Sequence, residues 1–236
     1  MSFFRTEINA DIHDVDYNGV VRASAIMKYI QSSAQLQLTE NGLSYDELKR
    51  NNKAFILSKI KLEINKTVRA YDKLYAETFP CESRGYSFLR CYRLTDGKST
   101  IAVAASVWAL IDTANHSLVR VNDFNLGLPT LPPLNLDIGR ISLPSELKLV
   151  GAYHVNYEAT DQNGHMNNTR YPDMYSNYLP LNQKRIKSIT VNYIKEAPMG
   201  EKLSVFRGEL NGAYYFKTVR ADGEINTAAE ITLSDI

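Results

Sequence analysis

Hydrophobic residues in the first part of the chain recur at helical spacing. The pattern predicts an amphipathic helix over residues 23–40, because apolar positions return every fourth residue along it. These positions are Ile26, Ile30, Ala34 and Leu38. Asn41-Gly42 follows directly, and a glycine just after the last helical turn is a common C-cap. The stretch SYDELKR (44–50) predicts a second, shorter helix.

The spacing then changes to the two-residue period of strands. Apolar and polar residues alternate over residues 59–65, as in a half-buried strand. Residues 85–94 and 99–111 read as two further strands, and Asp96-Gly97 between them predicts a hairpin turn. The first part of the chain is therefore a helix followed by an antiparallel meander.

The second part of the chain repeats this order. The motif D-x-N-G occurs at residues 16–19 and again 145 positions later (161 − 16) at 161–164. Residues 59–77 resemble 188–206, and the Asp-Gly pair of the first hairpin returns as Asp222-Gly223. Motifs that recur in the same order indicate two copies of one unit.

The repeat divides the chain into three parts. We expect a first repeat over residues 1–114, a linker over 115–147 and a second repeat over 148–236. The linker contains four of the eight prolines, which is typical of a segment that crosses a surface. The helix of the second repeat is predicted over residues 168–178, where Pro172 is tolerated only in the first turn.

Composition excludes several classes of protein. The chain of 236 residues is 44% hydrophobic and 22% charged, which is ordinary for a globular protein. A net charge of +1 argues against nucleic-acid binding. No apolar run is long enough to cross a membrane, and the first residues lack the features of a secretion signal or transit peptide. We therefore expect a cytoplasmic protein.

Two motifs are similar to those of a known enzyme family. DQNGHMNNTRY (161–171) resembles the D-x-N-x-H-x-N-N segment of acyl-acyl carrier protein (acyl-ACP) thioesterases. ITVNYIKE (189–196) resembles their later strand that ends in a catalytic glutamate, and residues 104–121 resemble the strand that closes their first repeat. The resemblance implies an α+β tandem (double) hotdog fold, with two antiparallel sheets that each wrap a central helix. It implies neither a metal nor a cofactor.

The chain also departs from the pattern of the plant members. Those members usually carry a cysteine after the glutamate, whereas Ala197 stands at this position, which excludes a thiol nucleophile there. They also begin with a plastid transit peptide, of which the first residues show no sign. The departures favour the bacterial type of the family.

The two copies differ at the positions that matter for chemistry. Val20 stands in the first turn where the second has His165, and Thr67 corresponds to Glu196 at an offset of 129 (196 − 67). Shared turn residues explain the turn, but an ionisable pair confined to one copy needs another explanation. Thioester hydrolysis requires a base for water and donors for the carbonyl oxygen.

The resemblance and this asymmetry together predict the catalytic residues. We expect His165 to accept the proton of water and Glu196 to share the water or to hold the imidazole in one tautomer. Asn163 would position water or the carbonyl, and Asp161 would orient Asn163 or His165. The backbone N–H groups at the start of the following helix, from Asn167 and Asn168 to Thr169, would form an oxyanion site.

The acyl chain requires an apolar tunnel, which the family builds from its first repeat. The candidate lining residues are Ile26, Ile30, Ala34 and Ile56. The expected partner is an acidic acyl carrier protein, which a basic cluster near the site would attract. The basic cluster comprises Lys184, Arg185, Lys187 and Lys195.

Several alternatives remain open from the sequence. The same residues suit an acyl-coenzyme A thioesterase or a hydroxyacyl dehydratase, and a hotdog protein without activity binds acyl chains. The sequence leaves undetermined the preferred chain length and saturation, and whether the protein is a monomer or a homodimer.

Overall fold

The first repeat contains a long helix and five strands that form one half of the sheet. A computed structural model describes residues 3–236, so residues 1 and 2 of the predicted first repeat lie outside the described residues. Its elements, in chain order, are β1 (Phe4–Asn9), η1 (Ile12–Asp14), α1 (Ala23–Glu40), α2 (Tyr45–Arg50), β2 (Lys53–Ile64), β3 (Lys73–Pro80), β4 (Phe88–Thr95) and β5 (Thr100–Asp112).

The second repeat has the same order of elements. Between the repeats lie β6 (Ser117–Val119) and η2 (Val121–Asp123). The elements of the second repeat are β7 (Lys148–His154), η3 (Tyr157–Ala159), η4 (Asn168–Arg170), α3 (Tyr171–Ser176), β8 (Lys184–Tyr193), β9 (Lys202–Leu210), β10 (Ala213–Val219) and β11 (Ile225–Asp235). The two copies inferred from the sequence are thus present in the fold.

The strands of both repeats form one sheet. Its order is β1-β3-β4-β5-β2-β8-β11-β10-β9-β7, with β6 added beside β5. Each strand of the first half has its counterpart at the mirrored place in the second half, as a tandem hotdog requires. The two sheets that we expected are joined edge to edge into one, because β2 and β8 pair directly, from Lys59 opposite Asn192 to Glu63 opposite Ser188. Backbone hydrogen bonds between the repeats therefore leave no edge at the centre of the molecule.

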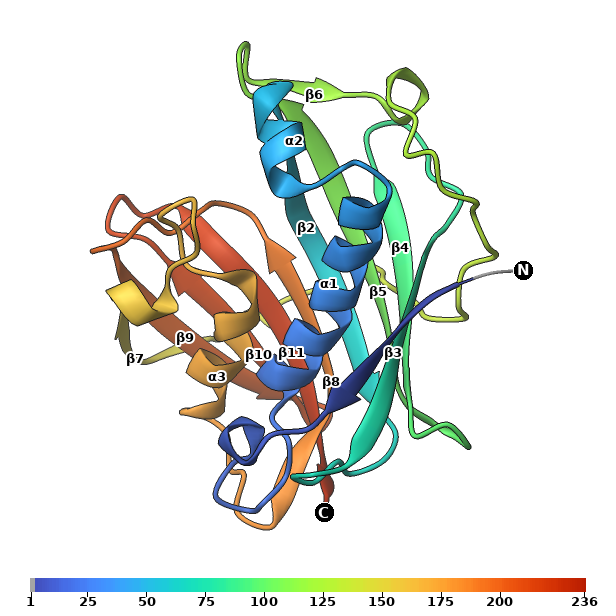
Figure 1. Cartoon of the computed structure of the whole chain (residues 1–236). Helices are drawn as coiled ribbons and strands as arrows, with labels where there is room; N and C mark the ends of the chain where they lie inside the picture. The colour runs from blue at the N-terminus through green and yellow to red at the C-terminus, as the bar shows by residue number, and fades with distance from the viewer. Residues whose placement is uncertain (1–2) are drawn as a thin grey trace.

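Helices α1 and α3 lie on the same face of this sheet (Figure 1). Helix α1 has the predicted bounds, and it ends as expected, with Gly42 at a φ of +75° after the C-cap Asn41. Helix α3 has only six residues, after a three-residue 3-10 turn, so the second repeat has a shorter helix than we predicted. Ser24 of α1 donates a hydrogen bond to Asp173 of α3. Within residues 3–236, no helix combines the length and apolar character needed to cross a bilayer.

The two predicted hairpins are confirmed. Gly97 and Gly223 each adopt a φ of +86° at the tips of β4–β5 and β10–β11, a conformation that glycine adopts without strain. In the first hairpin the Asp96 carboxylate accepts hydrogen bonds from two backbone N–H groups of the turn. These bonds lower the pKa of Asp96 to about 2.

The segment between the repeats covers the outer face of the first half of the sheet. Leu131 and Leu134 pack with the buried thiols of Cys81 and Cys91, neither of which is in a disulfide. The Lys59 ammonium of β2 also donates to the carbonyl oxygens of Ile138 and Gly139. Helix α1 covers the opposite face, so both faces of these strands are buried.

The seam between β2 and β8 offers a test of how the repeats stabilise one another. Ile60 is fully buried opposite Val191, and we expect Ile60→Ala to lower the free energy of unfolding by about 2–5 kcal/mol. Thermal and denaturant unfolding measure this loss. Ile225→Ala, in an exposed position of β11, should cost much less. Equal effects of the two substitutions would contradict a cooperative seam.

Candidate active site

The motif D-x-N-G forms a closed turn in the second repeat. The Asp161 carboxylate accepts the Asn163 N–H at 2.8 Å, and the Asp161 N–H donates to the His165 carbonyl at 2.9 Å. Gly164 adopts a φ of +76°, which a β-carbon would strain. The turn therefore fixes the backbone on both sides of the Asn163 and His165 side chains.

The first repeat forms the same turn without the ionisable side chain. The Asp16 carboxylate accepts the Asn18 N–H at 2.9 Å, and the Asp16 N–H donates to the Val20 carbonyl at 2.8 Å. Asp161 and Asp16 thus make the same contacts, although the turn of Asp16 contains no histidine. These contacts explain the shape of the turn.

His165 and Glu196 meet, although 31 positions (196 − 165) separate them in the chain. The His165 Nδ1 lies 3.3 Å from the Glu196 Oε2. The Met166 N–H donates to the Ala197 carbonyl at 2.8 Å and so holds the turn beside the end of β8. The side chains are 34% and 57% exposed, so water reaches both of them.

Asn163 makes a contact that the sequence did not predict. Its Oδ1 accepts a hydrogen bond of 2.7 Å from the hydroxyl of Tyr45, the first residue of α2. Helix α2 belongs to the first repeat and has no counterpart in the second. Because its oxygen is occupied, the Asn163 amide presents its two N–H donors to other groups. No sequence signal links Tyr45 to a turn 118 residues away.

The predicted oxyanion site at the start of the helix is poorly supported. The Asn167 N–H donates to the Ala159 carbonyl, and the Thr169 N–H donates to the Asn167 side chain at 2.9 Å. Asn167 thus caps the 3-10 turn η4, and the Asn168 carbonyl accepts from the Tyr193 hydroxyl at 2.8 Å. Two of the expected donors already have acceptors, and a six-residue helix adds little dipole.

A cavity of about 440 Å³ leads from the first repeat to this turn. Its walls come from α1, α2 and the strands β2, β4 and β5, and its lining reaches the turn at Thr160, Asn163 and Asn167. His165 and Glu196 are on the same turn and the adjoining strand end, but they do not line the cavity. The apolar part of the lining consists of Ala34, Leu38, Leu48, Ala54, Phe55, Pro80, Phe88, Leu89, Tyr92, Trp108 and Leu126.

The four residues predicted to line the acyl tunnel lie in different parts of the structure. Only Ala34 lines this cavity. Ile30 is buried in the core, Ile26 lines a different cavity, and Ile56 lines neither of the two. The helical period identified the buried face of α1 correctly, but the wall of the cavity is formed mainly by the neighbouring, more exposed side of the helix, at Lys28, Gln31 and Gln35.

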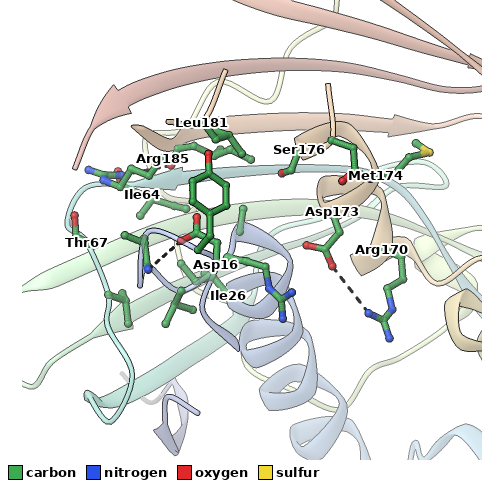
Figure 2. A pocket seen from close by; sticks show the side chains of 18 of the residues that line it. Asp16, Ile26, Ile64, Thr67, Arg170, Asp173, Met174, Ser176, Leu181 and Arg185 are labelled. Atoms are coloured by element: carbon green, nitrogen blue, oxygen red, sulfur yellow. Dashed lines mark hydrogen bonds and ion pairs between the residues drawn. The ribbon is translucent and has the colours of Figure 1, made fainter. Parts of the chain in front are cut away.

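A second cavity, of about 360 Å³, lies between the D-x-N-G turn of the first repeat and α3 (Figure 2). Its place in the first repeat corresponds to that of the His165 turn in the second. Asp16 and Thr67 line it on one side, and Asp173 and Ser176 of α3 line it on the other. Thr67 stands at the position of Glu196, and Val20, at the position of His165, is also in its lining. In this cavity Val20 and Thr67 therefore stand where the second repeat has the His165–Glu196 pair.

The predicted basic cluster does not form one surface near the candidate site. Lys184, Arg185 and Lys187 lie at the beginning of β8, and Arg185 lines the cavity of Figure 2. Lys195 follows the other end of the strand and pairs with Glu224 at 3.2 Å. A strand of this length spans roughly 30 Å, so the cluster is split between two places.

Comparisons with known proteins agree with the fold and the repeat. The family model described as the acyl-ACP thioesterase N-terminal domain matches residues 2–125, and that of the C-terminal domain matches residues 144–235. No match was found among curated proteins.

Two solved structures share the fold across almost the whole chain. An acyl-ACP thioesterase from Bacteroides thetaiotaomicron has a TM-score of 0.85 at 20% identity, over 98% of each chain. The 12:0-ACP thioesterase from Umbellularia californica has a TM-score of 0.86 at 14% identity, over 99% of this chain and 98% of that one. Identities this low establish a common fold and no more.

Proposed function

The chain belongs to the acyl-ACP thioesterase family, a family of thioester hydrolases, and we propose that it releases free fatty acid from acyl-ACP at the His165–Glu196 pair. The observation that carries this assignment is the 3.3 Å contact between the imidazole and the carboxylate. Such a contact occurs only in the second repeat, because Val20 and Thr67 replace the pair in the first.

His165 acts as the base for water in this proposal. With Nδ1 directed at Glu196, the imidazole keeps Nε2 for the proton of the attacking water. The carboxylate stabilises the imidazolium that forms as the oxygen of water bonds to the carbonyl carbon. The imidazolium then returns the proton to the departing sulfur, and the carbon–sulfur bond breaks to give a free acid and the carrier thiol.

Asn163 supplies donors to the carbonyl oxygen. Its amide N–H groups are available because Tyr45 occupies its oxygen, and it lines the mouth of the cavity. The thioester would lie at this mouth, between the donors of Asn163 and the base. A donor aimed at the developing oxyanion typically contributes about 100- to 1,000-fold to the rate.

The two repeats have different tasks in this proposal. Residues 1–114 provide most of the acyl cavity, residues 148–236 provide the ionisable pair and the end of the cavity beside it, and residues 115–147 link the two repeats. The acyl chain enters the cavity between α1 and the sheet, and the carrier protein stays outside. The cytoplasmic location and the bacterial type inferred from the sequence remain predictions.

Hydrolysis of acyl carrier proteins of graded chain length tests the function. We expect the purified protein to release free fatty acid, with a maximum at the length that fills the cavity. Coenzyme A thioesters of the same acyl groups serve as the comparison. A higher kcat/KM for these thioesters would show that the enzyme prefers coenzyme A to the carrier protein. Absence of release from either series would contradict the proposal.

The contact between the repeats predicts a smaller effect. Tyr45→Phe removes the hydroxyl that orients Asn163, and we expect kcat/KM to fall by about 3- to 10-fold. The same substitution in an Asn163→Ala background should have little further effect, since the oriented amide is already lost. Tyr157→Phe, at an exposed tyrosine of the second repeat, is the matched control. Additive losses in the double variant would contradict the positioning role.

A further inference from the structure

A buried arginine lines the acyl cavity. Arg90 lies on the inward face of β4 between Phe88 and Tyr92, and only 7% of its surface is exposed. Its Nη1 donates to the Gln37 Oε1 at 2.6 Å and to the Thr78 hydroxyl at 2.9 Å. Within residues 3–236 these are its only hydrogen bonds, so the rest of the guanidinium keeps donors for another group.

No carboxylate neutralises this charge. Glu77, beside Thr78 on β3, contacts Arg5 and Arg93 instead, each at 3.7 Å. Among residues 3–236, Arg90 is in no ion pair, and burial lowers its pKa. Charged groups are rarely this buried unless an opposite charge or strong acceptors surround them. Among residues 3–236, the two acceptors that Arg90 contacts, Gln37 and Thr78, are both neutral.

A second donor in the same cavity has no acceptor. Gln31 of α1 lines the cavity, and its Nε2 is buried without a hydrogen-bond partner. An unsatisfied buried amide is as unfavourable as a lost hydrogen bond unless a ligand satisfies it. The Gln31 Nε2 of α1 and the remaining N–H groups of Arg90 on β4 therefore have no acceptor among the described residues that line the cavity.

We propose that this cavity selects acyl chains that carry an additional acceptor oxygen (a ketone, hydroxyl or carboxylate) beyond the thioester, which Arg90 and Gln31 bind. The proposal rests on the proposed function, since it assigns the cavity to the acyl chain. A plain hydrocarbon chain leaves both donors without acceptors, and a site built for hydrogen bonds discriminates strongly against such a chain. An oxygen at the correct position satisfies them and offsets the buried charge.

Binding of non-hydrolysable substrate analogues tests the selection separately from catalysis. The ligands are acyl-pantetheine amides of one chain length, one plain and the others with a ketone moved along the chain. Calorimetric titration of the whole protein should show at least one ketone ligand binding about 10- to 100-fold more tightly than the plain one. Equal affinity for the plain chain and every ketone ligand would overturn the proposal.

The Arg90→Met variant identifies the residue responsible. Methionine fills the space without a charge, and replacing a buried unpaired charge by an apolar residue is often tolerated. We expect the preference for the ketone to disappear while the plain chain binds at least as well. Gln31→Met, at a half-buried position, should reduce the preference in part. Arg84→Met, with its side chain 87% exposed, is the control that keeps the full preference.

The outcomes separate this inference from the proposed function. A preference for the ketone that survives in Arg90→Met would overturn the role of Arg90. Hydrolysis of plain thioesters together with equal binding would leave the function in place and overturn the selection. Selective binding without hydrolysis of any thioester would support the selection and contradict the function.

Discussion

Replacing His165 with alanine is expected to lower kcat/KM for acyl-ACP hydrolysis by about 100- to 10,000-fold. A positioned base contributes roughly this factor to proton transfer. No second histidine replaces it, because Val20 occupies the corresponding position of the first repeat. Since the side chain is 34% exposed, its removal leaves only a small cavity, and the stability of the fold should hardly change.

Release of fatty acid under single-turnover conditions measures this effect on the chemical step. His154→Ala is the matched control, since it removes an exposed histidine of the same repeat, on β7. We expect His154→Ala to hydrolyse at the wild-type rate and His165→Ala to unfold at the wild-type temperature. A His165→Ala variant that retains more than about a tenth of the activity would exclude the base assigned here.

Much of the fold could be predicted because its signals are local. The bounds of α1 follow from a four-residue period and an Asn-Gly cap, and the hairpin tips follow from Asp-Gly pairs that adopt positive φ. Comparison of the two repeats also singled out His165 and Glu196, because Val20 and Thr67 stand at their positions in the first copy. Each of these inferences needed only a few neighbouring residues or a comparison of the chain with itself.

The features that were missed depend on contacts between the repeats. The pairing of β2 with β8, which joins the sheet, has no local signal, because both strands alternate as any half-buried strand does. The contact between Tyr45 and Asn163 joins an element found in one repeat to a turn in the other.

Arg90 is a different case, because a signal for it was present in the sequence. In the strand 85–94 the alternation assigns Phe88, Arg90 and Tyr92 to one face. A charge among inward-facing aromatic residues contradicts the pattern of a simple core, and such contradictions often mark function. The period alone would have directed attention to this position.

Replacing Glu196, the carboxylate beside His165, is the second substitution for which we expect a large loss of activity. Glu196→Gln keeps the size of the side chain but removes the negative charge that faces His165 Nδ1 at 3.3 Å. The imidazolium that forms during attack then lacks its partner, and a neutral amide can also hold the imidazole in the wrong tautomer. We expect kcat to fall by about 100- to 1,000-fold, with KM nearly unchanged, because the carboxylate does not line the acyl cavity.

Steady-state kinetics on one acyl-ACP separates kcat from KM in this variant. Glu224→Gln is the control, since Glu224 is similarly exposed and pairs with Lys195, one residue before Glu196. In a His165→Ala background, Glu196→Gln should cause little further loss, because the carboxylate acts through the imidazole. If the two losses multiply instead, Glu196 acts on water independently of His165, and the two residues are separate catalytic groups.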